Sequence, residues 1–269
     1  MVEIIHISDF HYGSTEFKKE LLLKVIDYIN KVKPDLVVCT GDLTHKGKVE
    51  QFQEVAEILK AIQVPFFAVP GNHDARNNGL MFFEKYFQRL HSKLIIPEKK
   101  VILLGMRSAK DDISEGELGD EQLEWMIHTL QKYPLENRII ALHHHLVAVP
   151  YSGRQRNTLI DAGEVLEINR LMKVDLVLMG HKHVPHVWRV GHSVLLYCGT
   201  TCSTKLRADE KPCFNHIKLD NSDLEVYVVN SDNFEKYLLI SRKKGKTDYI
   251  KARKGRLEHI LRSPIEETY

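Results

Sequence analysis

The chain has 269 residues, of which 43% are hydrophobic and 28% charged, a composition typical of a globular protein with a sizeable core. Its formal net charge of +2 excludes a strong overall field for nucleic acid or anionic membrane. The sequence contains no run of about 18 apolar residues, so we expect no membrane-spanning helix. Residues 1–6 lack the basic and apolar regions of a secretory signal, and we therefore expect a cytoplasmic protein.

Strand and helix patterns alternate through the first two thirds of the chain. Apolar runs predict strands at 3–8, 35–40, 65–69, 100–104, 138–142 and 174–179. Apolar residues at helical spacing predict helices at 18–31, 50–62, 82–90, 121–130 and 161–172. After residue 180 the pattern changes to short strands at 186–190, 193–197, 214–219, 224–229 and 236–240. This order predicts an α/β fold in which two packed sheets are flanked by helices within one domain.

The end of the chain differs in composition from the rest. We place the domain at residues 1–241 and a basic extension at 242–269, because residues 242–262 contain nine Lys and Arg against Asp248 and Glu258. A solvated terminal extension is one interpretation. A patch that contacts nucleic acid or a partner subunit is the other.

Polar side chains follow five of the predicted strands. They are Asp9-Phe10-His11, Gly41-Asp42, Gly71-Asn72-His73-Asp74, His143-His144-His145 and Gly180-His181-Lys182-His183. Because ligands gather beyond the carboxyl ends of strands in open α/β sheets, we expect these segments at one rim. Each segment alone is a weak signal, since an Asp-x-His pair also fits a turn that caps a helix. Together, Asp, Asn and His without Cys predict a site for Zn, Fe, Mn or a similar dication.

In this order the segments resemble the signature of the calcineurin-like metallophosphoesterases. Gly41-Asp42-Leu43-Thr44 and Pro70-Gly71-Asn72-His73-Asp74, with Arg76 beyond, are most similar to the bacterial and archaeal branch that contains class III cyclic-nucleotide phosphodiesterases. Gly116-Glu117-Leu118-Gly119 and Gly199-Thr200 are also similar to that branch. The resemblance covers about residues 1–220. It implies a four-layer αββα sandwich of two mixed β-sheets flanked by helices.

The resemblance also implies two divalent or mixed-valence metal ions, such as Mn, Fe or Zn. Asp9, His11, Asp42 and His183 would hold one ion, and Asp42, Asn72, His143 and His181 the other. The chemistry agrees, because an anionic bridge such as Asp42 reduces the repulsion between two neighbouring dications. A water bridging the ions would have its pKa lowered toward ~7 and would attack phosphorus as a hydroxide.

Further residues are assigned by position. His73 matches the family position that protonates the leaving group or stabilises the transition state, and Asp74 would orient it; a histidine that satisfies a turn is the alternative. Among the three adjacent histidines we choose His143 as the ligand, because it directly follows the strand. His144 should then point the opposite way, and His145 should share the side of His143 and line the pocket or bind substrate.

Four more side chains are candidates for binding the substrate, each with an alternative. His45 faces the substrate or caps a turn. Arg76 contacts phosphate or pairs with Asp111 or Asp112. Arg154 and Arg156, in the loop at 151–157, recognise a second anionic group of the substrate or are simply exposed.

These observations lead to one principal hypothesis and several alternatives. The principal hypothesis is a dinuclear-metal-dependent phosphodiesterase that hydrolyses a small diester such as a cyclic nucleotide. A phosphomonoesterase or pyrophosphohydrolase would use the same metal core. A DNA or RNA nuclease of the repair type is weakly supported by the basic extension. A non-catalytic scaffold is least favoured because every expected ligand is present, and a homodimer through the strands after residue 186 stays open.

Overall fold

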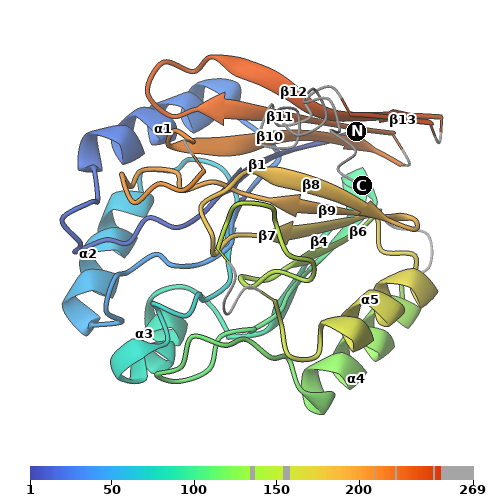
Figure 1. The fold of residues 1–269 in the computed structure, drawn as a ribbon, viewed down its shortest axis with the longest axis horizontal. Helices are drawn as coiled ribbons and strands as arrows, with labels where there is room; N and C mark the ends of the chain where they lie inside the picture. Colours follow the sequence, from blue (N-terminus) through green and yellow to red (C-terminus); the bar gives the residue numbers. More distant parts are fainter. Residues whose placement is uncertain (134–136, 154–157, 209, 222, 245, 250–269) are drawn as a thin grey trace, which may run out of the picture.

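The strands of this computed structural model lie in two β-sheets (Figure 1), and the model describes residues 1–133, 137–153, 158–208, 210–221, 223–244 and 246–249. The first sheet has the strand order β13-β12-β11-β10-β1-β2-β3, and the second has the order β4-β5-β6-β7-β9-β8. The strands of the first sheet are β1 (Val2–Ile7), β2 (Leu36–Cys39), β3 (Phe66–Ala68), β10 (Cys213–Asp220), β11 (Asp223–Asn230), β12 (Lys236–Lys243) and β13 (Lys246–Tyr249). Those of the second are β4 (Ser92–Ile96), β5 (Val101–Gly105), β6 (Asn137–Ala141), β7 (Leu176–Met179), β8 (His186–Val190) and β9 (Ser193–Tyr197).

Both sheets are mixed, as the sequence predicts. Strands β1, β2 and β3 run parallel, whereas β10 to β13 join them as an antiparallel series. In the second sheet β5, β6, β7 and β9 run parallel, and the edge strands β4 and β8 are antiparallel to their neighbours. The carboxyl ends of the parallel strands in each sheet therefore share one edge, and the loops that follow them gather there.

In the described part of the chain, five α-helices cover the outer faces of the two sheets. α1 (Lys19–Val32), α2 (Val49–Leu59) and α3 (Gly79–Tyr86) pack on the first sheet, and α4 (Asp120–Gln131) and α5 (Ala162–Leu171) pack on the second. Alternation along β1 shows the layering, since Ile4 lies in the core between the sheets and Ile5 lies in the core beneath α1. The predicted arrangement of two sheets between flanking helices is confirmed.

The sequence does not predict the two edge strands β4 and β13. β4 pairs only with β5, and its side chains are partly exposed, so it lacks the continuous apolar run of a buried strand. The helix predicted at 82–90 begins earlier and ends at Tyr86, and Phe87 leaves helical geometry with φ −121°. These differences lie at the periphery and leave the arrangement of the strand ends unchanged.

The predicted domain boundary after residue 241 falls inside β12. β12 continues to Lys243, and β13 pairs with it antiparallel, so residues 242–243 and 246–249 lie in strands of the first sheet. Arg242 is buried there and donates from Nη1 to the carbonyl of His192 at 3.0 Å. Strand pairing therefore holds these first basic residues, and residues 250–269 lie outside the described part of the chain. Within that part, no helix is both long and apolar enough to cross a membrane.

His6, in β1 beneath the rim, provides a test of how burial controls stability. Asn215 donates to its Nδ1 at 3.2 Å, so its Nε2 donates to Thr40 Oγ1 at 2.9 Å. Burial lowers the pKa of His6 to about 3, whereas an unfolded histidine has a pKa of about 6.5. Below pH 6.5, His6 therefore binds a proton in the unfolded chain but stays neutral in the folded chain. The contribution of neutral, buried His6 to the free energy of unfolding is fully present above pH 6.5 and is lost as the pH falls toward 3.

We expect His6→Asn to flatten the pH dependence of the free energy of unfolding. The wild type should lose about 1.4 kcal/mol per pH unit through this residue between pH 6 and pH 4, and the variant should lack that component. Urea unfolding at pH 7, 6, 5 and 4 measures both slopes. Parallel slopes would show that His6 is already protonated in the folded protein.

Candidate active site

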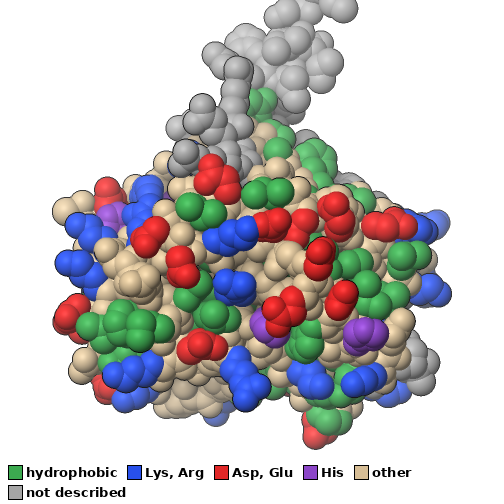
Figure 2. Space-filling model, turned by 90° about the horizontal axis from the view of Figure 1, so that it is seen from below, with side chains coloured by type: hydrophobic (Ala, Val, Ile, Leu, Met, Phe, Trp, Pro, Cys, Tyr) green, Lys and Arg blue, Asp and Glu red, His purple; other side chains and the backbone are tan. Residues whose placement is uncertain are grey.

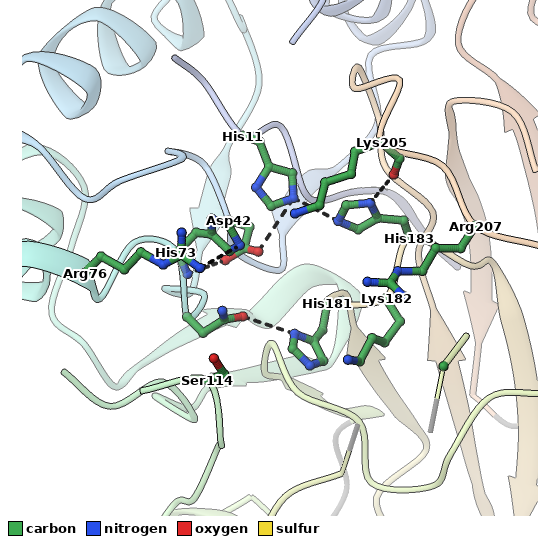
Figure 3. Close-up of a pocket in the computed structure, with 12 residues that line it drawn as sticks. His11, Asp42, His73, Arg76, Ser114, His181, Lys182, His183, Lys205 and Arg207 are labelled. Atoms are coloured by element: carbon green, nitrogen blue, oxygen red, sulfur yellow. Dashed lines mark hydrogen bonds and ion pairs between the residues drawn. The ribbon is translucent and has the colours of Figure 1, made fainter. Parts of the chain in front are cut away.

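The polar segments that follow β1, β2, β3, β6 and β7 meet at one rim. Figure 3 shows side chains from four of these segments: His11, Asp42, His73, His181 and His183. The loops after β1 and β2 are joined by backbone hydrogen bonds, from Asp9 N to the carbonyl of Gly41 and from His11 N to the carbonyl of Asp42, both at 2.9 Å. Between the sheets, His143 Nε2 lies 3.1 Å from Asn72 Oδ1. The structure therefore brings together the residues that the sequence places at separate strand ends.

One cluster of potential metal ligands combines carboxylates from the first sheet with two imidazoles. His183 Nε2 lies 3.3 Å from Asp9 Oδ1 and 2.8 Å from His11 Nε2. His11 Nε2 lies 3.7 Å from Asp42 Oδ2. All four side chains are buried. They are the four residues that the family resemblance assigns to one ion.

A second cluster shares Asp42 with the first. His143 Nε2 lies 3.5 Å from Asp42 Oδ1, the other oxygen of the same carboxylate. Asn72 Oδ1 lies 3.1 Å from both His143 Nε2 and His181 Nδ1. The two oxygens of Asp42 thus face different clusters, which is the arrangement that a bridging carboxylate requires.

The chemistry of these donors fits metal ions. Asp9 Oδ1 is buried and has no hydrogen-bond donor among the described residues, although a buried carboxylate oxygen is normally satisfied. His143 donates from Nδ1 to the carbonyl of Thr40 at 2.6 Å, and His183 donates from Nδ1 to the carbonyl of Lys205. These bonds fix the tautomer that leaves each Nε2 lone pair facing the clusters, as in protein metal sites.

The backbone of the ligand loops adopts an uncommon conformation. Five of the predicted ligands have positive φ angles: Asp9 (56°), His11 (55°), Asp42 (52°), His181 (80°) and His183 (57°). Residues other than glycine rarely occupy this region, although Asp and His do so more often than most. Gly71 allows a close approach beside them, because a Cβ at this position would lie 2.2 Å from Asp42 Oδ1.

His73 is held next to the shared carboxylate. Its backbone N–H donates to Asp42 Oδ1 at 2.8 Å, and its Nδ1 donates to the carbonyl of His45 at 2.8 Å. Its Nε2 is left to accept a hydrogen bond, and Arg76 Nη2 lies 3.3 Å away. Burial lowers the pKa of His73 more than the charge of Asp42 raises it, so the ring is neutral at pH 7. Arg76 contacts His73 and His45 rather than Asp111 or Asp112.

The structure corrects the predicted role of Asp74. Its carboxylate accepts hydrogen bonds from the backbone N–H groups of Leu43, Thr44 and Gly71 and from the hydroxyl of Thr44. These contacts join the loop after β2 to the loop after β3, and the carbonyl of His45 orients His73 instead. Burial and the charge of Asp42 raise the pKa of Asp74 to about 7.

The prediction that His145 faces the cavity is also corrected. His145 is 1% exposed, its Nε2 donates to the carbonyl of Gly180 at 2.8 Å, and its ring contacts Tyr197. β6 already ends at Ala141, so strand alternation does not apply to the three histidines that follow. His144 is held separately, with Nδ1 2.9 Å from Ser108 Oγ. The backbone carbonyl of His45 accepts the hydrogen bond from His73 Nδ1, and the rings of the two residues lie side by side with centroids 5.2 Å apart.

A cavity of about 540 Å³ opens above the clusters. His11, Asp42, Asn72, His73, Arg76, His181 and His183 line it, as does a group that the sequence analysis missed: Ser114, Gly153, Lys182, Lys205 and Arg207. Lys205 and Arg207 lie in an irregular loop after the Gly199-Thr200 segment, where residue spacing does not predict which side chains face the cavity. The sequence signal that could have identified them is the presence of two cations close to that segment. Arg154 and Arg156 lie outside the described residues.

Comparison with known proteins identifies the family. A family model described as calcineurin-like phosphoesterase matches residues 2–185. The chain belongs to the calcineurin-like phosphoesterase family. This membership confirms the predicted resemblance and the enzyme class, a metal-dependent phosphoric-ester hydrolase.

Curated relatives in the calcineurin-like phosphoesterase family are named as phosphodiesterases. A probable glycerophosphodiester phosphodiesterase of Arcobacter nitrofigilis is 32% identical over 158 residues, which are 54% of this chain and 58% of that protein. A 3′,5′-cyclic-nucleotide phosphodiesterase of Nostoc sp. is 29% identical over 199 residues, 68% of this chain and 71% of that protein. A 3′,5′-cyclic adenosine monophosphate phosphodiesterase of Escherichia coli is 29% identical over 200 residues, 68% of this chain and 70% of that protein.

Solved structures confirm the calcineurin-like phosphoesterase fold. A dimetal phosphatase from Danio rerio superposes with a TM-score of 0.70 at 13% identity, covering 88% of this chain and 98% of that one. A purple acid phosphatase from yellow lupin superposes with a TM-score of 0.69 at 14% identity, covering 88% of this chain and 52% of that one. At this identity the likeness concerns the fold.

Proposed function

We propose that this protein is a dinuclear-metal-dependent phosphodiesterase that hydrolyses a small phosphodiester. The observation that carries the proposal is the position of Asp42, whose two carboxylate oxygens face two separate ligand clusters beneath one cavity. Asp9, His11, Asp42 and His183 would hold one ion, and Asp42, Asn72, His143 and His181 the other. Mn, Fe and Zn all accept this set of oxygen and imidazole donors.

The residues around the clusters support phosphoryl chemistry. Metal ions bound at such a site activate water at neutral pH and neutralise charge on phosphoryl oxygens. His73, with Nδ1 held by the carbonyl of His45, presents Nε2 to the cavity beside Arg76. Nε2 carries no proton in the neutral ring, so it would first take a proton from solvent and then pass that proton to the departing alkoxide, and the Arg76 guanidinium would offset negative charge next to it. The neutral amide of Asn72 limits negative charge where an anionic substrate must bind.

The names of the relatives favour a small diester as the substrate. Those names specify glycerophosphodiesters in one relative and 3′,5′-cyclic nucleotides in two others. The substrates have in common a phosphodiester on a compact alcohol, and a cavity of about 540 Å³ is of the size that accepts such molecules.

The face in Figure 2 gives no separate support to a nuclease. The face in Figure 2 carries interspersed acidic and basic side chains, in keeping with the net charge of +2. Residues 242–243 and 246–249 lie in strands at a sheet edge, and the basic residues after 249 lie outside the described part. Nucleic-acid binding through the extension, a homodimer and a cytoplasmic location stay predictions from the sequence.

A substrate panel on the metal-reconstituted chain tests this function. We expect cleavage of 3′,5′- and 2′,3′-cyclic mononucleotides, a glycerophosphodiester or a chromogenic diester in preference to a chromogenic monoester and single-stranded DNA. A chelator should abolish turnover, and Mn²⁺, Fe²⁺ or Zn²⁺ should restore it. Preference for DNA would favour the nuclease, preference for the monoester a phosphatase, and no turnover with any dication a scaffold.

A further inference from the structure

A second cleft, of about 590 Å³, lies where the end of α3, the start of β4 and the face of α4 come together. Figure 1 shows α3 and α4 at the same end of the molecule. Arg89, His91, Lys93, Arg107 and Trp125 are among the residues that line it. The cleft shares no lining residue with the cavity above the metal clusters. We call it the β4 cleft.

Positive charge predominates in the β4 cleft. Arg89, Lys93 and Arg107 line it, and Glu84 is the single acidic side chain among the described residues of its lining. Within the described part of the chain, no carboxylate lies within ion-pair distance of these three cations, and neither guanidinium donates a hydrogen bond. Lys93 Nζ lies over the ring of Tyr133, 5.8 Å from its centroid. Cations that no protein carboxylate balances favour an anionic ligand.

Trp125 gives the cleft an aromatic surface. Its indole is partly buried against the core between α4 and the second sheet, and it lines the cleft. The His91 ring meets the indole edge to face, with centroids 5.2 Å apart. Since the core holds the indole from behind, its position is fixed before any ligand arrives. A flat ring held in this way can stack on an aromatic ligand.

One buried side chain fixes Arg107 relative to Trp125. Gln122 Oε1 accepts a hydrogen bond from the backbone N–H of Arg107 at 2.9 Å, and Gln122 Nε2 donates to the carbonyl of Arg107 at 2.9 Å. Gln122 is 3% exposed and lies three positions before Trp125 on α4, so the two are neighbours on the helix surface. The backbone that carries the Arg107 guanidinium is therefore attached to the helix that carries the indole. Such preorganisation lowers the entropic cost of binding.

We propose that the β4 cleft binds a small ligand that joins a phosphate to an aromatic ring, with the chemistry of a nucleoside monophosphate. The guanidinium groups of Arg89 and Arg107 would hold the phosphate, because the planar set of donors in a guanidinium matches phosphate oxygens. The base would stack on the indole of Trp125. A cleft of about 590 Å³ is of the size that accepts such a molecule. The site does not depend on the phosphodiesterase function proposed above.

The fluorescence of Trp125 tests the site directly. The chain has two tryptophans, so Trp188→Phe leaves Trp125 as the single indole emitter. The probes are AMP, which has both groups, adenosine, which lacks the phosphate, and ribose 5-phosphate, which lacks the base and is measured by displacement of AMP. We expect AMP to change the emission at low ionic strength and to bind at least about tenfold more tightly than either fragment.

Variants of the two arginines separate the phosphate contact from stacking. In the Trp188→Phe background, Arg107→Gln, and further Arg89→Gln/Arg107→Gln, should raise the Kd of AMP by about tenfold and leave that of adenosine nearly unchanged. These side chains have no partner among the described residues, so their loss should not disturb the fold. Arg170→Gln is the matched control, because Arg170 is an exposed arginine on α5 that does not line the cleft. It should bind AMP as the parent does.

Three results would overturn the proposal. They are an unchanged Trp125 emission with AMP, displacement of AMP by ribose 5-phosphate at equal concentration, and an unchanged Kd of AMP in Arg89→Gln/Arg107→Gln. AMP bound only in the cavity above the metal clusters would give the first and the third of these results. None of the measurements requires turnover, so the β4 cleft and the proposed hydrolase can fail independently.

Discussion

Asp42→Ala is expected to abolish hydrolysis and to lower the metal content to less than one ion per chain. The carboxylate faces both clusters, with Oδ2 3.7 Å from His11 Nε2 and Oδ1 3.5 Å from His143 Nε2. Its removal takes an anionic ligand away from each cluster. It also removes the negative charge that would reduce the repulsion between two dications. We expect kcat/KM to fall by more than about 10³-fold. Elemental analysis and a chromogenic diester assay measure the two effects.

Two further variants make the result specific. Asp42→Asn keeps the shape and one oxygen donor but loses the charge, so it should retain more metal than Asp42→Ala while staying nearly inactive. Asp27→Ala removes an exposed carboxylate on α1 and should behave as the wild type. Activity above a few per cent in Asp42→Ala, with normal metal content, would contradict the role of Asp42 as the bridge.

His73→Asn is expected to lower turnover while the metal content stays near that of the wild type. The backbone N–H of residue 73 still reaches Asp42 Oδ1, so the ligand loops should remain in place. The lost group is Nε2, which lines the cavity beside Arg76. Removal of an acid–base group of this kind typically costs about 10²–10⁴-fold in rate. Single-turnover assays with parallel elemental analysis provide the measurement.

The matched control makes the same His-to-Asn substitution at a position away from the cavity. His128 lies on the exposed side of α4, so His128→Asn should leave both turnover and metal content unchanged. If His73→Asn loses its metal together with its activity, His73 supports the loops and takes no part in proton transfer.

The strand ends were predictable because their chemistry is concentrated in short segments. A continuous apolar run such as residues 36–39 indicates a strand covered on both faces, and the Gly-Asp pair after it marks the point where the chain leaves the sheet. Parallel strands then bring such points to one edge without any knowledge of side-chain contacts. The positions of Asp9, Asp42 and Asn72 follow from this reasoning alone.

Contacts made through backbone carbonyls were not predictable in the same way. The carbonyls of Thr40, His45 and Lys205 orient His143, His73 and His183, and any residue type carries a carbonyl. Asp74 and His145 were misplaced for a related reason, since loop backbones rather than strand alternation decide where their side chains point. The remaining cavity cations were missed because only the folded chain brings Lys182, Lys205 and Arg207 together at the cavity.

The positive φ angles of the ligand loops also bear on how such a site persists through evolution. Each of Asp9, His11, Asp42, His181 and His183 holds a conformation that costs about 1 kcal/mol or more in a residue other than glycine, and the packed sheets offset that cost. Glycine at any of these positions would relax the backbone and remove a ligand in the same step. Selection for stability alone would therefore favour loss of these five side chains.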